Sequence, residues 1–337
     1  IQIFNKTENS FFNMLAYSNL KMRNRVFYYV SNYAYNFLPV FFFKKKYKKL
    51  LDFERSCNPG ELKFRLDYYL KITDKIRLPD TAVSIKNFKK TNGTGYYLDL
   101  KEFLHYFKKN TLFAYYFGDK TSVNNYPTLV KARTIEGDNA NSILFKLNKN
   151  RHFYFVKDSI SFLEKKDSLV WRGGAYQKNR IAFVQKFWNK PNFNVGQTNV
   201  PRADLPWQKT RMSIPEQLQY KFIFCPEGND VATNLKWVMS SNSLCFMPKP
   251  KFETWFMEGL LKPNIHYVEI NSDFSDLESK IKYFSKHNDE AVQIIENAHK
   301  HVAQFQNTNF EDLLCLKVLT AYTSLSKQKD ALKFLRN

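Results

Sequence analysis

The stretch YKFIFCPEGNDVATNLKWVMSSNSLCF, residues 220–246, contains a strand pattern, a turn and a helix pattern in immediate succession. Its apolar run KFIFC stops at Pro226, and Gly228, a residue that permits tight backbone turns, follows. The segment DVATNLKWVMSS then has helical periodicity, and SLCFM is again strand-like. Strand, turn, helix and strand in this order are typical of a parallel α/β sheet.

The same pattern continues on both sides of this stretch. SLVW is a strand that stops at Arg172-Gly173-Gly174, NRIAFVQKFW is helical, FNVG is strand-like and IPEQLQY is helical. Downstream, we predict a helix for ETWFMEGLL, a strand for HYVEI and only helices from Ser275 onward. Strands and helices that alternate at this spacing predict a Rossmann-like domain, with helices on both faces of the sheet.

The N-terminal half does not alternate strands and helices in this way. It contains the short strand patterns TLFAYYFGD, TLVKAR, SILFKL and HFYFVKD. No low-complexity linker separates the halves, so the domain boundary rests on the change of pattern. We therefore predict an N-terminal domain over residues 1–165, a C-terminal domain over residues 166–310 and a final helix over residues 311–337.

Composition limits the partners of the chain. Its 337 residues are 44% hydrophobic, and 52 lysines and arginines against 31 acidic residues give a net charge of +21. These values predict a globular protein of two domains rather than one, with anionic partners: nucleic acid, an acidic membrane surface or phosphorylated small molecules. The four cysteines lie far apart without a CxxC pair, so neither a disulfide framework nor a zinc site is predicted.

Residues 26–43, VFYYVSNYAYNFLPVFFF, contain no charged side chain and are flanked by basic residues on both sides. Interior polar residues and Pro39 argue against a helix that crosses a membrane. Aromatic rings beside a lysine cluster favour a position at an anionic membrane surface. The alternative is an ordinary buried helix with a solvated basic end.

Ligands of open α/β sheets bind beyond the carboxyl ends of the strands, where helix N-termini present free amides. After KFIFC, Asn229, Asp230 or Thr233 is placed to cap the next helix, and Lys236 is placed to reach back toward an anion. This arrangement predicts a phosphate-bearing ligand. A solvated Lys236 and an ordinary turn at Gly228 are the alternative.

The end of the SLVW strand has similar chemistry. Arg172 lies at the strand end and Arg180 in the following helix, and two guanidinium groups there can clamp a diphosphate in bidentate fashion. Neither this stretch nor residues 220–246 has Walker A or GxGxxG spacing, so nucleoside triphosphatase and dinucleotide-binding functions lose support.

Two aspartates are candidates for a general base. Asp119 and Asp158 each follow an apolar run that is predicted to be a strand. Either is equally compatible with a capping or solvated role. His152 and His266 also lie near strands, where a lone histidine is more often structural.

The segments LVWRGG with Arg180, residues 220–246, ETWFMEGLLKPNIHYVEINSDFSDLESKI and NDEAVQIIENA resemble glycosyltransferase family 90 in order and spacing. The similarity covers about residues 95–305, and the branch that acts on bacterial lipopolysaccharide core looks closest through EGNDVATNLKW, KPNIHYVE, YPTLVKAR and NKNRHFYFVKD. This resemblance implies a GT-B architecture, in which two Rossmann-like domains face a cleft and C-terminal helices follow. The nucleotide-sugar is then held mainly by the C-terminal domain.

The resemblance also implies a reaction. It is the inverting, metal-independent transfer of a hexose, glucose or galactose, from a UDP-sugar to an inner-core acceptor of lipopolysaccharide or lipooligosaccharide. We expect no cofactor, no metal and no nucleic-acid partner, and a cytoplasmic enzyme that is peripheral on the inner face of the cytoplasmic membrane. Because the chain contains no Asp-x-Asp pair, cationic side chains and helix dipoles would stabilise the departing diphosphate.

Residue by residue, Arg172, Gly173 and Arg180 fall on the diphosphate-contacting arginine motif of the family, and Asp119 falls on its catalytic base. Where the eukaryotic relatives have an arginine, this chain has Asn234, with Lys236 two positions later, so donor contacts are expected to be redistributed. The predicted donor-binding set is Arg172, Gly173, Arg180, Gly228, Asp230, Thr233, Asn234 and Lys236.

The alternative function is a basic, aromatic-rich nucleic-acid-binding protein without catalysis. Against it, the basic residues are dispersed, and the sequence has no RNA-recognition aromatic motif, helix-turn-helix or zinc finger. A membrane-surface scaffold without catalysis is a third interpretation.

Overall fold

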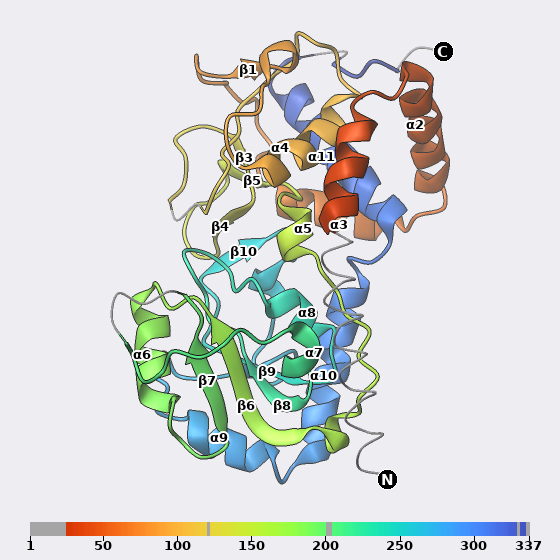
Figure 1. Ribbon diagram of the computed structural model, residues 1–337. Coiled ribbons are helices and arrows are strands. Elements are labelled where there is room, and N and C mark those ends of the chain that lie inside the picture. Colours follow the sequence, from red (N-terminus) through yellow and green to blue (C-terminus); the bar gives the residue numbers. More distant parts are fainter. Residues whose placement is uncertain (1–24, 120–121, 200–203, 329–330, 335–337) are drawn as a thin grey trace. The chain divides into compact units, whose positions relative to one another are not determined.

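The computed structural model describes residues 25–119, 122–199, 204–328 and 331–334 of the chain (Figure 1). They form two compact units, each assembled from separate stretches of sequence. Unit 1 contains the described residues up to 28, together with residues 153–250 and 260–302. Unit 2 contains residues 29–152, residues 251–259 and the described residues from 303 onward.

Unit 1 is built on a five-stranded parallel sheet in the order β11-β9-β8-β6-β7 (Figure 1). Its strands are β6 (Lys166–Gly173), β7 (Phe193–Gln197), β8 (Tyr220–Phe224), β9 (Leu244–Met247) and β11 (Val268–Glu269). The strand that follows β6 along the chain, β7, pairs with one edge of β6. The later strands β8, β9 and β11 are added on the other side of β6. The strand order therefore reverses between β6 and β8, which makes this place a topological switch point. The predicted parallel sheet is confirmed.

Helices cover both faces of this sheet. The helical segments of unit 1 are η2 (Phe162–Glu164), α6 (Lys178–Phe187), α7 (Ile214–Gln217), α8 (Leu235–Met239), α9 (Leu277–Phe284) and α10 (Asn288–Ala303). Phe222 and Phe224 of β8 pack in one core with Phe183 of α6 and Ile281 of α9. Ile223, which points to the opposite side of the pleat, is buried as well. Burial on both faces explains why these strands read as continuous apolar runs.

Unit 2 combines helices with small sheets. Its helical segments are α2 (Val40–Glu54), α3 (Pro59–Tyr69), η1 (Ile85–Asn87), α4 (Thr94–Leu104), α5 (Lys149–His152) and α11 (Thr308–Leu325). Its strands are β1 (Val83–Ser84), β2 (Leu112–Phe113), β3 (Thr128–Val130), β4 (Ala132–Thr134), β5 (Ser142–Leu144) and β10 (Phe252–Thr254). Among the described residues these strands form two-stranded sheets, β1-β2, β3-β5 and β4-β10. The α/β class and the predicted C-terminal helices are confirmed.

Two predicted elements of the sequence are wrong. ETWFMEGLL is not a helix, because β10 pairs with β4 and a short 3-10 helix, η3 (Glu258–Leu260), follows. Met257 has φ 56°, which a continuous helix does not allow. HFYFVKD is not a strand: the amide of Val156 donates to Ser240 Oγ at 2.9 Å, and residues 153–158 form no ladder.

The helix after residue 230 is much shorter than predicted. Residues 229–234 are turn and irregular structure, and α8 begins only at Leu235. Asn234, the residue before α8, donates from Nδ2 to Phe224 O at 2.9 Å and so ties this loop to the end of β8. Asp230 and Thr233 therefore do not cap a helix.

Residues 26–43 form two helical segments rather than one. Residues 25–35 are helical, a turn covers residues 36–38, and α2 follows. In the described part of the chain, no helix has the length and apolar character that membrane crossing requires.

Candidate active site

Arg180 lies at the topological switch point of unit 1. It belongs to the first turn of α6, and its guanidinium donates to Gly174 O (3.2 Å) after β6. It also donates to Glu227 O (3.1 Å) and to Pro226 O (2.9 Å), both after β8. Sheets with this strand order bind ligands at the place where the order reverses. Arg180 therefore fixes the two loops between which a ligand is expected.

Further contacts join the same two loops. Gln177 Nε2 donates to Asn229 Oδ1 at 2.9 Å, and Asn179 Nδ2 donates to Glu227 O at 3.2 Å. The first turn of α6 contains no acidic residue, and Gln177 makes no capping hydrogen bond from its side chain. The positive end of the helix dipole is thus directed toward these loops without a competing carboxylate in that turn.

Gly228 belongs to this site for a reason other than the predicted one. Its φ does not lie in the left-handed region, so the turn does not require glycine. A Cβ atom at this position would instead lie 3.1 Å from Nη2 of Arg180. Glycine is favoured here because it lets the guanidinium approach the backbone of the loop.

Arg172 is a residue of β6, and its side chain binds the neighbouring strand β7, on the side away from β8. Its Nη1 donates to Asn194 O and its Nη2 to Asn194 Oδ1, both at 2.6 Å, and its Nε donates to Thr210 O at 3.2 Å. Asn194 is part of β7, whereas Arg180 contacts the loop after β8. Burial lowers the pKa of Arg172. Arg172 thus binds β7, on one side of β6, whereas Arg180 binds the loop after β8, on the other side. Only Arg180 of the two lies at the switch point.

Gly173, the last residue of β6, accepts a hydrogen bond from the amide of Thr198 at 2.9 Å. A Cβ atom there would lie 2.7 Å from the Trp171 ring, so a side chain would displace that buried indole. Gly173 therefore contributes close packing at the end of β6.

The loop and helix after β8 hold the remaining predicted donor residues. Asp230 is buried, and its carbonyl accepts from the amide of Gly228 at 2.9 Å. Thr233 is half-buried in the turn before α8. Lys236 has no exposed surface, which contradicts the solvated alternative, and its reach toward an anion at the start of the helix stays a prediction. Its charge acts on the nearby Cys225 thiol, although burial still raises the pKa of Cys225 well above its usual value.

Asp119, the predicted base, lies in unit 2. It follows Gly118, whose φ is 141°, in an irregular segment beyond β2 rather than at a strand tip. Asp119 Oδ1 lies 2.5 Å from Nζ of Lys131. The lysine side chain is 1% exposed, whereas the carboxylate is 26% exposed. The ion pair therefore holds a partly exposed carboxylate at the surface of this unit.

The other candidate base, Asp158, is a structural residue. Its side chain is 2% exposed and lies 2.7 Å from Nζ of the buried Lys165. It also accepts from the amides of Ile160 and Asn242. A carboxylate with these partners is not accessible to a substrate. His152 is buried, and His266 Nδ1 accepts from the amide of Lys262 at 2.9 Å.

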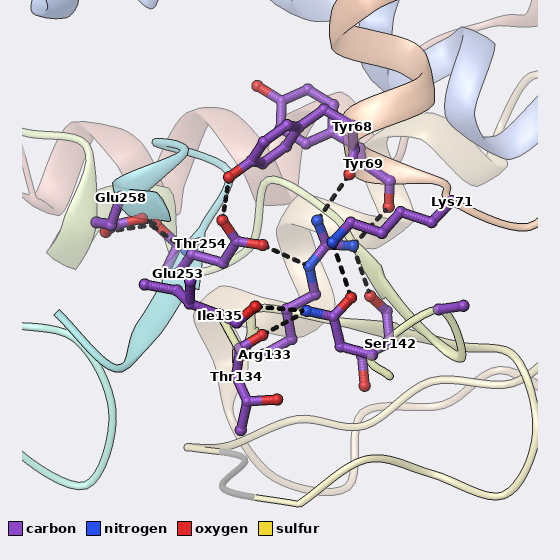
Figure 2. Close-up of polar contacts among 12 residues, drawn as sticks. Tyr68, Tyr69, Lys71, Arg133, Thr134, Ile135, Ser142, Glu253, Thr254 and Glu258 are labelled. Carbon is purple, nitrogen blue, oxygen red and sulfur yellow. Dashed lines mark hydrogen bonds and ion pairs between the residues drawn. The ribbon is translucent and has the colours of Figure 1, made fainter. Parts of the chain in front are cut away.

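A buried charge cluster in unit 2 was not predicted (Figure 2). Arg133 Nε lies 2.7 Å from Glu253 Oε1, and Tyr68 OH donates to Glu253 Oε2. Arg133 also donates to Tyr68 O at 2.7 Å and to Ser142 O at 3.2 Å. Burial and the Glu253 charge raise the pKa of Tyr68, which keeps its hydroxyl a donor. These contacts join α3, β4, β5 and β10.

Two neighbours complete this cluster. A Cβ atom on Gly259 would lie 2.6 Å from Glu253 Oε2 and 2.8 Å from Tyr68 OH. Glu258 accepts from the amide and the hydroxyl of Thr254. The sequence does contain a signal for the cluster, because Lys131 and Arg133 stand in the apolar run TLVKAR, and a charge buried by such a run needs a partner.

Comparison with known proteins identifies the family of the chain. The sequence profile of Glycosyl transferase family 90 matches residues 152–333. O-glucosyltransferase LpsA of Dichelobacter nodosus is 40% identical over 307 residues, which cover 90% of this chain and 96% of that protein. The O-glucosyltransferase rumi homologs of Aedes aegypti and Anopheles gambiae are each 27% identical over 181 residues, which cover 50% of this chain and 44% and 45% of those proteins. The chain therefore belongs to glycosyl transferase family 90, as its motifs predicted, and is a glycosyltransferase.

Proposed function

We propose that this enzyme transfers a hexose, glucose or galactose, from a UDP-sugar to an inner-core acceptor of lipopolysaccharide or lipooligosaccharide. The observation that carries the proposal is the 40% identity with an O-glucosyltransferase over 96% of that protein's length. The name of that relative supports glucose as the first candidate. Galactose is the second candidate, because it differs from glucose only in the configuration at one carbon.

The donor site of the proposal is the switch point between β6 and β8. The diphosphate of UDP lies between the loops that Arg180 joins, near the first turn of α6, and Gly228 contributes by leaving room for the Arg180 guanidinium. Arg172, Gly173, Asp230, Thr233, Asn234 and Lys236 complete the proposed set. In this proposal Asp230, Asn234 and Lys236 act by holding the shape of the loop, because their side chains are buried or bound to the backbone.

We assign the two units to the two domains of a GT-B enzyme. Unit 1 binds the nucleotide-sugar, because it contains the parallel sheet and its switch point. Unit 2 binds the acceptor and carries Asp119. The predicted domain limits at residues 165/166 and 310/311 stay a prediction, because the units change at residues 152/153 and 302/303 and residues 251–259 belong to unit 2.

The proposed reaction is an in-line displacement with inversion. The acceptor hydroxyl oxygen forms a bond to the anomeric carbon as the bond from that carbon to the UDP oxygen breaks. Asp119 accepts the hydroxyl proton, and UDP leaves with the electron pair of the broken bond. Arg180 and the helix dipole of α6 stabilise the charge that develops on UDP. Because the chain has no Asp-x-Asp pair for a divalent metal, we propose that these groups act without one.

The positive net charge of the chain supports the proposed acceptor and the proposed location at a membrane. The phosphates and acidic sugars of an inner core are complementary to a chain with a net charge of +21. We propose that the enzyme is peripheral on the inner face of the cytoplasmic membrane, where such an acceptor is assembled.

The test is UDP release from UDP-glucose and UDP-galactose, with delipidated core oligosaccharide as acceptor and with a chelator in a parallel reaction. The proposal predicts acceptor-dependent release from one of the two donors, which the chelator does not change. Release from neither donor would refute the assigned donor class. Release that a chelator abolishes and Mg²⁺ restores would refute the metal-independent mechanism.

A further inference from the structure

The surface of unit 2 carries a cluster of exposed apolar side chains at the turn between the first helical segment and α2. Phe37 is 85% exposed, and Val40 and Phe41 are 64% and 61% exposed. Phe42 is also exposed, and its ring stacks on Phe41 with centroids 4.2 Å apart. We call residues 37 and 40–42 the aromatic tip. Large apolar side chains gathered in this way are typical of a surface that contacts a partner or a membrane.

Basic side chains follow the aromatic tip along α2. Lys44, Lys45, Lys48 and Lys49 are exposed, whereas Phe43, Tyr47 and Leu50 form the buried face of the helix. Within the described part of the chain, these four lysines make no ion pair with a carboxylate. By contrast, Lys46, on the inner side, is bound to Glu102 and Asp312.

Acidic residues of α2 lie only at its far end and are already paired. Asp52 lies 3.0 Å from Arg55, and Glu54 lies 2.5 Å from Lys317. The first three turns of the helix thus combine apolar and positive side chains only. A pocket of about 560 Å³ opens on this side, lined by Phe41, Lys44, Lys45, Tyr47, Lys48, Leu51 and Phe334.

We propose that the aromatic tip and these four lysines form the docking surface of this enzyme for a bilayer of anionic phospholipid. Aromatic rings are stabilised at the headgroup level, and lysines one to two helical turns behind them reach lipid phosphates. The pocket then accommodates one lipid phosphate between Lys44, Lys45 and Lys48. An uncharged apolar partner would leave the lysines without counter-charges, and nucleic acid would leave Phe37 and Val40 exposed. This inference specifies the residues behind the membrane location proposed above.

The test is sedimentation of the full chain with vesicles of phosphatidylcholine, with and without phosphatidylglycerol. The wild type is expected to bind only the vesicles with phosphatidylglycerol, and less at high salt. Replacing Lys44, Lys45, Lys48 and Lys49 with Gln should lower the partition coefficient by on the order of 1000-fold. The matched control changes four other exposed lysines of unit 2 to Gln, Lys86, Lys89, Lys90 and Lys109, and removes the same charge.

Equal loss in the two lysine variants would overturn the proposal, because net charge alone would then explain binding. Unchanged binding in the α2 variant would overturn it too. The variant Phe37→Ser with Phe41→Ser should bind at least about tenfold more weakly at every salt concentration, since it removes apolar contact rather than charge. A shift of this variant to a smaller oligomer, with vesicle binding retained, would assign the tip to a second copy of the chain and contradict the proposal.

Transfer to soluble core oligosaccharide separates this inference from the proposed function. The α2 lysine variant should transfer sugar to that acceptor as the wild type does. A wild type that binds vesicles but transfers no sugar would contradict the proposed function alone.

Discussion

The buried ammonium of Lys131 lies 2.5 Å from the partly exposed carboxylate of Asp119. This contact connects the predicted base to the strand segment TLVKAR, in which Lys131 stands between β3 and β4. The contact holds the carboxylate of Asp119 in one orientation, as the proposed role of general base requires. It also means that a change of Asp119 alters the stability of unit 2 as well as its chemistry.

Asp119→Asn should reduce transfer by about 10² to 10⁴ and leave UDP affinity unchanged, because the base does not contact the diphosphate. The variant should also be less stable, since it removes a carboxylate from a buried lysine. The double variant Asp119→Asn with Lys131→Met removes both charges and should recover stability in urea unfolding without recovering transfer. If the double variant regains transfer, the role of Asp119 is structural.

Arg180→Ala should weaken UDP binding by at least about tenfold, as expected for loss of a charge-assisted contact and of the bonds that hold two loops together. Lys186→Ala is the matched control, because Lys186 lies in the last turn of the same helix and contacts Asp273 O. Isothermal titration with UDP measures both. We also expect Arg172→Ala to weaken UDP binding, and unchanged affinity would remove Arg172 from the donor site.

Glu253→Gln should lower the free energy of unfolding by about 3–5 kcal/mol, because Arg133 stays buried after losing its carboxylate. Lys63→Gln is the comparison, since the Lys63–Asp67 pair is largely exposed and should contribute less than about 1 kcal/mol. Urea unfolding of the two variants gives both values. A small effect of Glu253→Gln would mean that the cluster in Figure 2 contributes little to the stability of unit 2.

His105 should make the stability of unit 2 depend on pH. Burial, with the charges of Lys101 and Lys333, lowers the pKa of His105 to about 4, and its ring stacks on Phe43 at 4.5 Å. The unfolded chain binds this proton below about pH 6.5, whereas the folded chain binds it only near pH 4. Stability should therefore fall as pH decreases through this window, by about 1 to 2 kcal/mol between pH 7 and 5 for a partly exposed ring.

Urea unfolding at pH 7 and pH 5 measures this effect. His105→Gln should keep the hydrogen bond to Asn36 and lose the part of the pH dependence that belongs to His105. An identical pH dependence in the wild type and in His105→Gln would contradict the assignment.

Local sequence patterns predicted the sheet of unit 1 well and the loop after β8 poorly. Runs such as KFIFC are apolar at every position, and a parallel sheet covered on both faces produces that pattern directly. DVATNLKWVMSS also has a helical period, but Asn234 binds the carbonyl of Phe224 and delays the helix. ETWFMEGLL became β10 because its partner strand lies far away in sequence, at Ala132–Thr134. Pairing of this kind cannot be read from a local window.

In the predicted site, too, local sequence patterns predicted which residues lie at strand ends but not which contacts they make with distant residues. Arg180 and Gly228 were selected because they follow strand ends, and the structure brings them together at the switch point. Lys236 was selected for its charge, but its burial depends on how α8 packs against β9, which spacing within the sequence does not reveal. Arg172 was placed correctly at the end of β6, whereas its engagement with Asn194 depends on the neighbouring strand.

A crystal structure of the chain with UDP tests the central claim most directly. The account predicts the two phosphates between the loops after β6 and β8, with a phosphate oxygen within hydrogen-bonding distance of the Arg180 guanidinium or of the first amides of α6. Density for UDP at another edge of the sheet, or in unit 2 away from these loops, would contradict it.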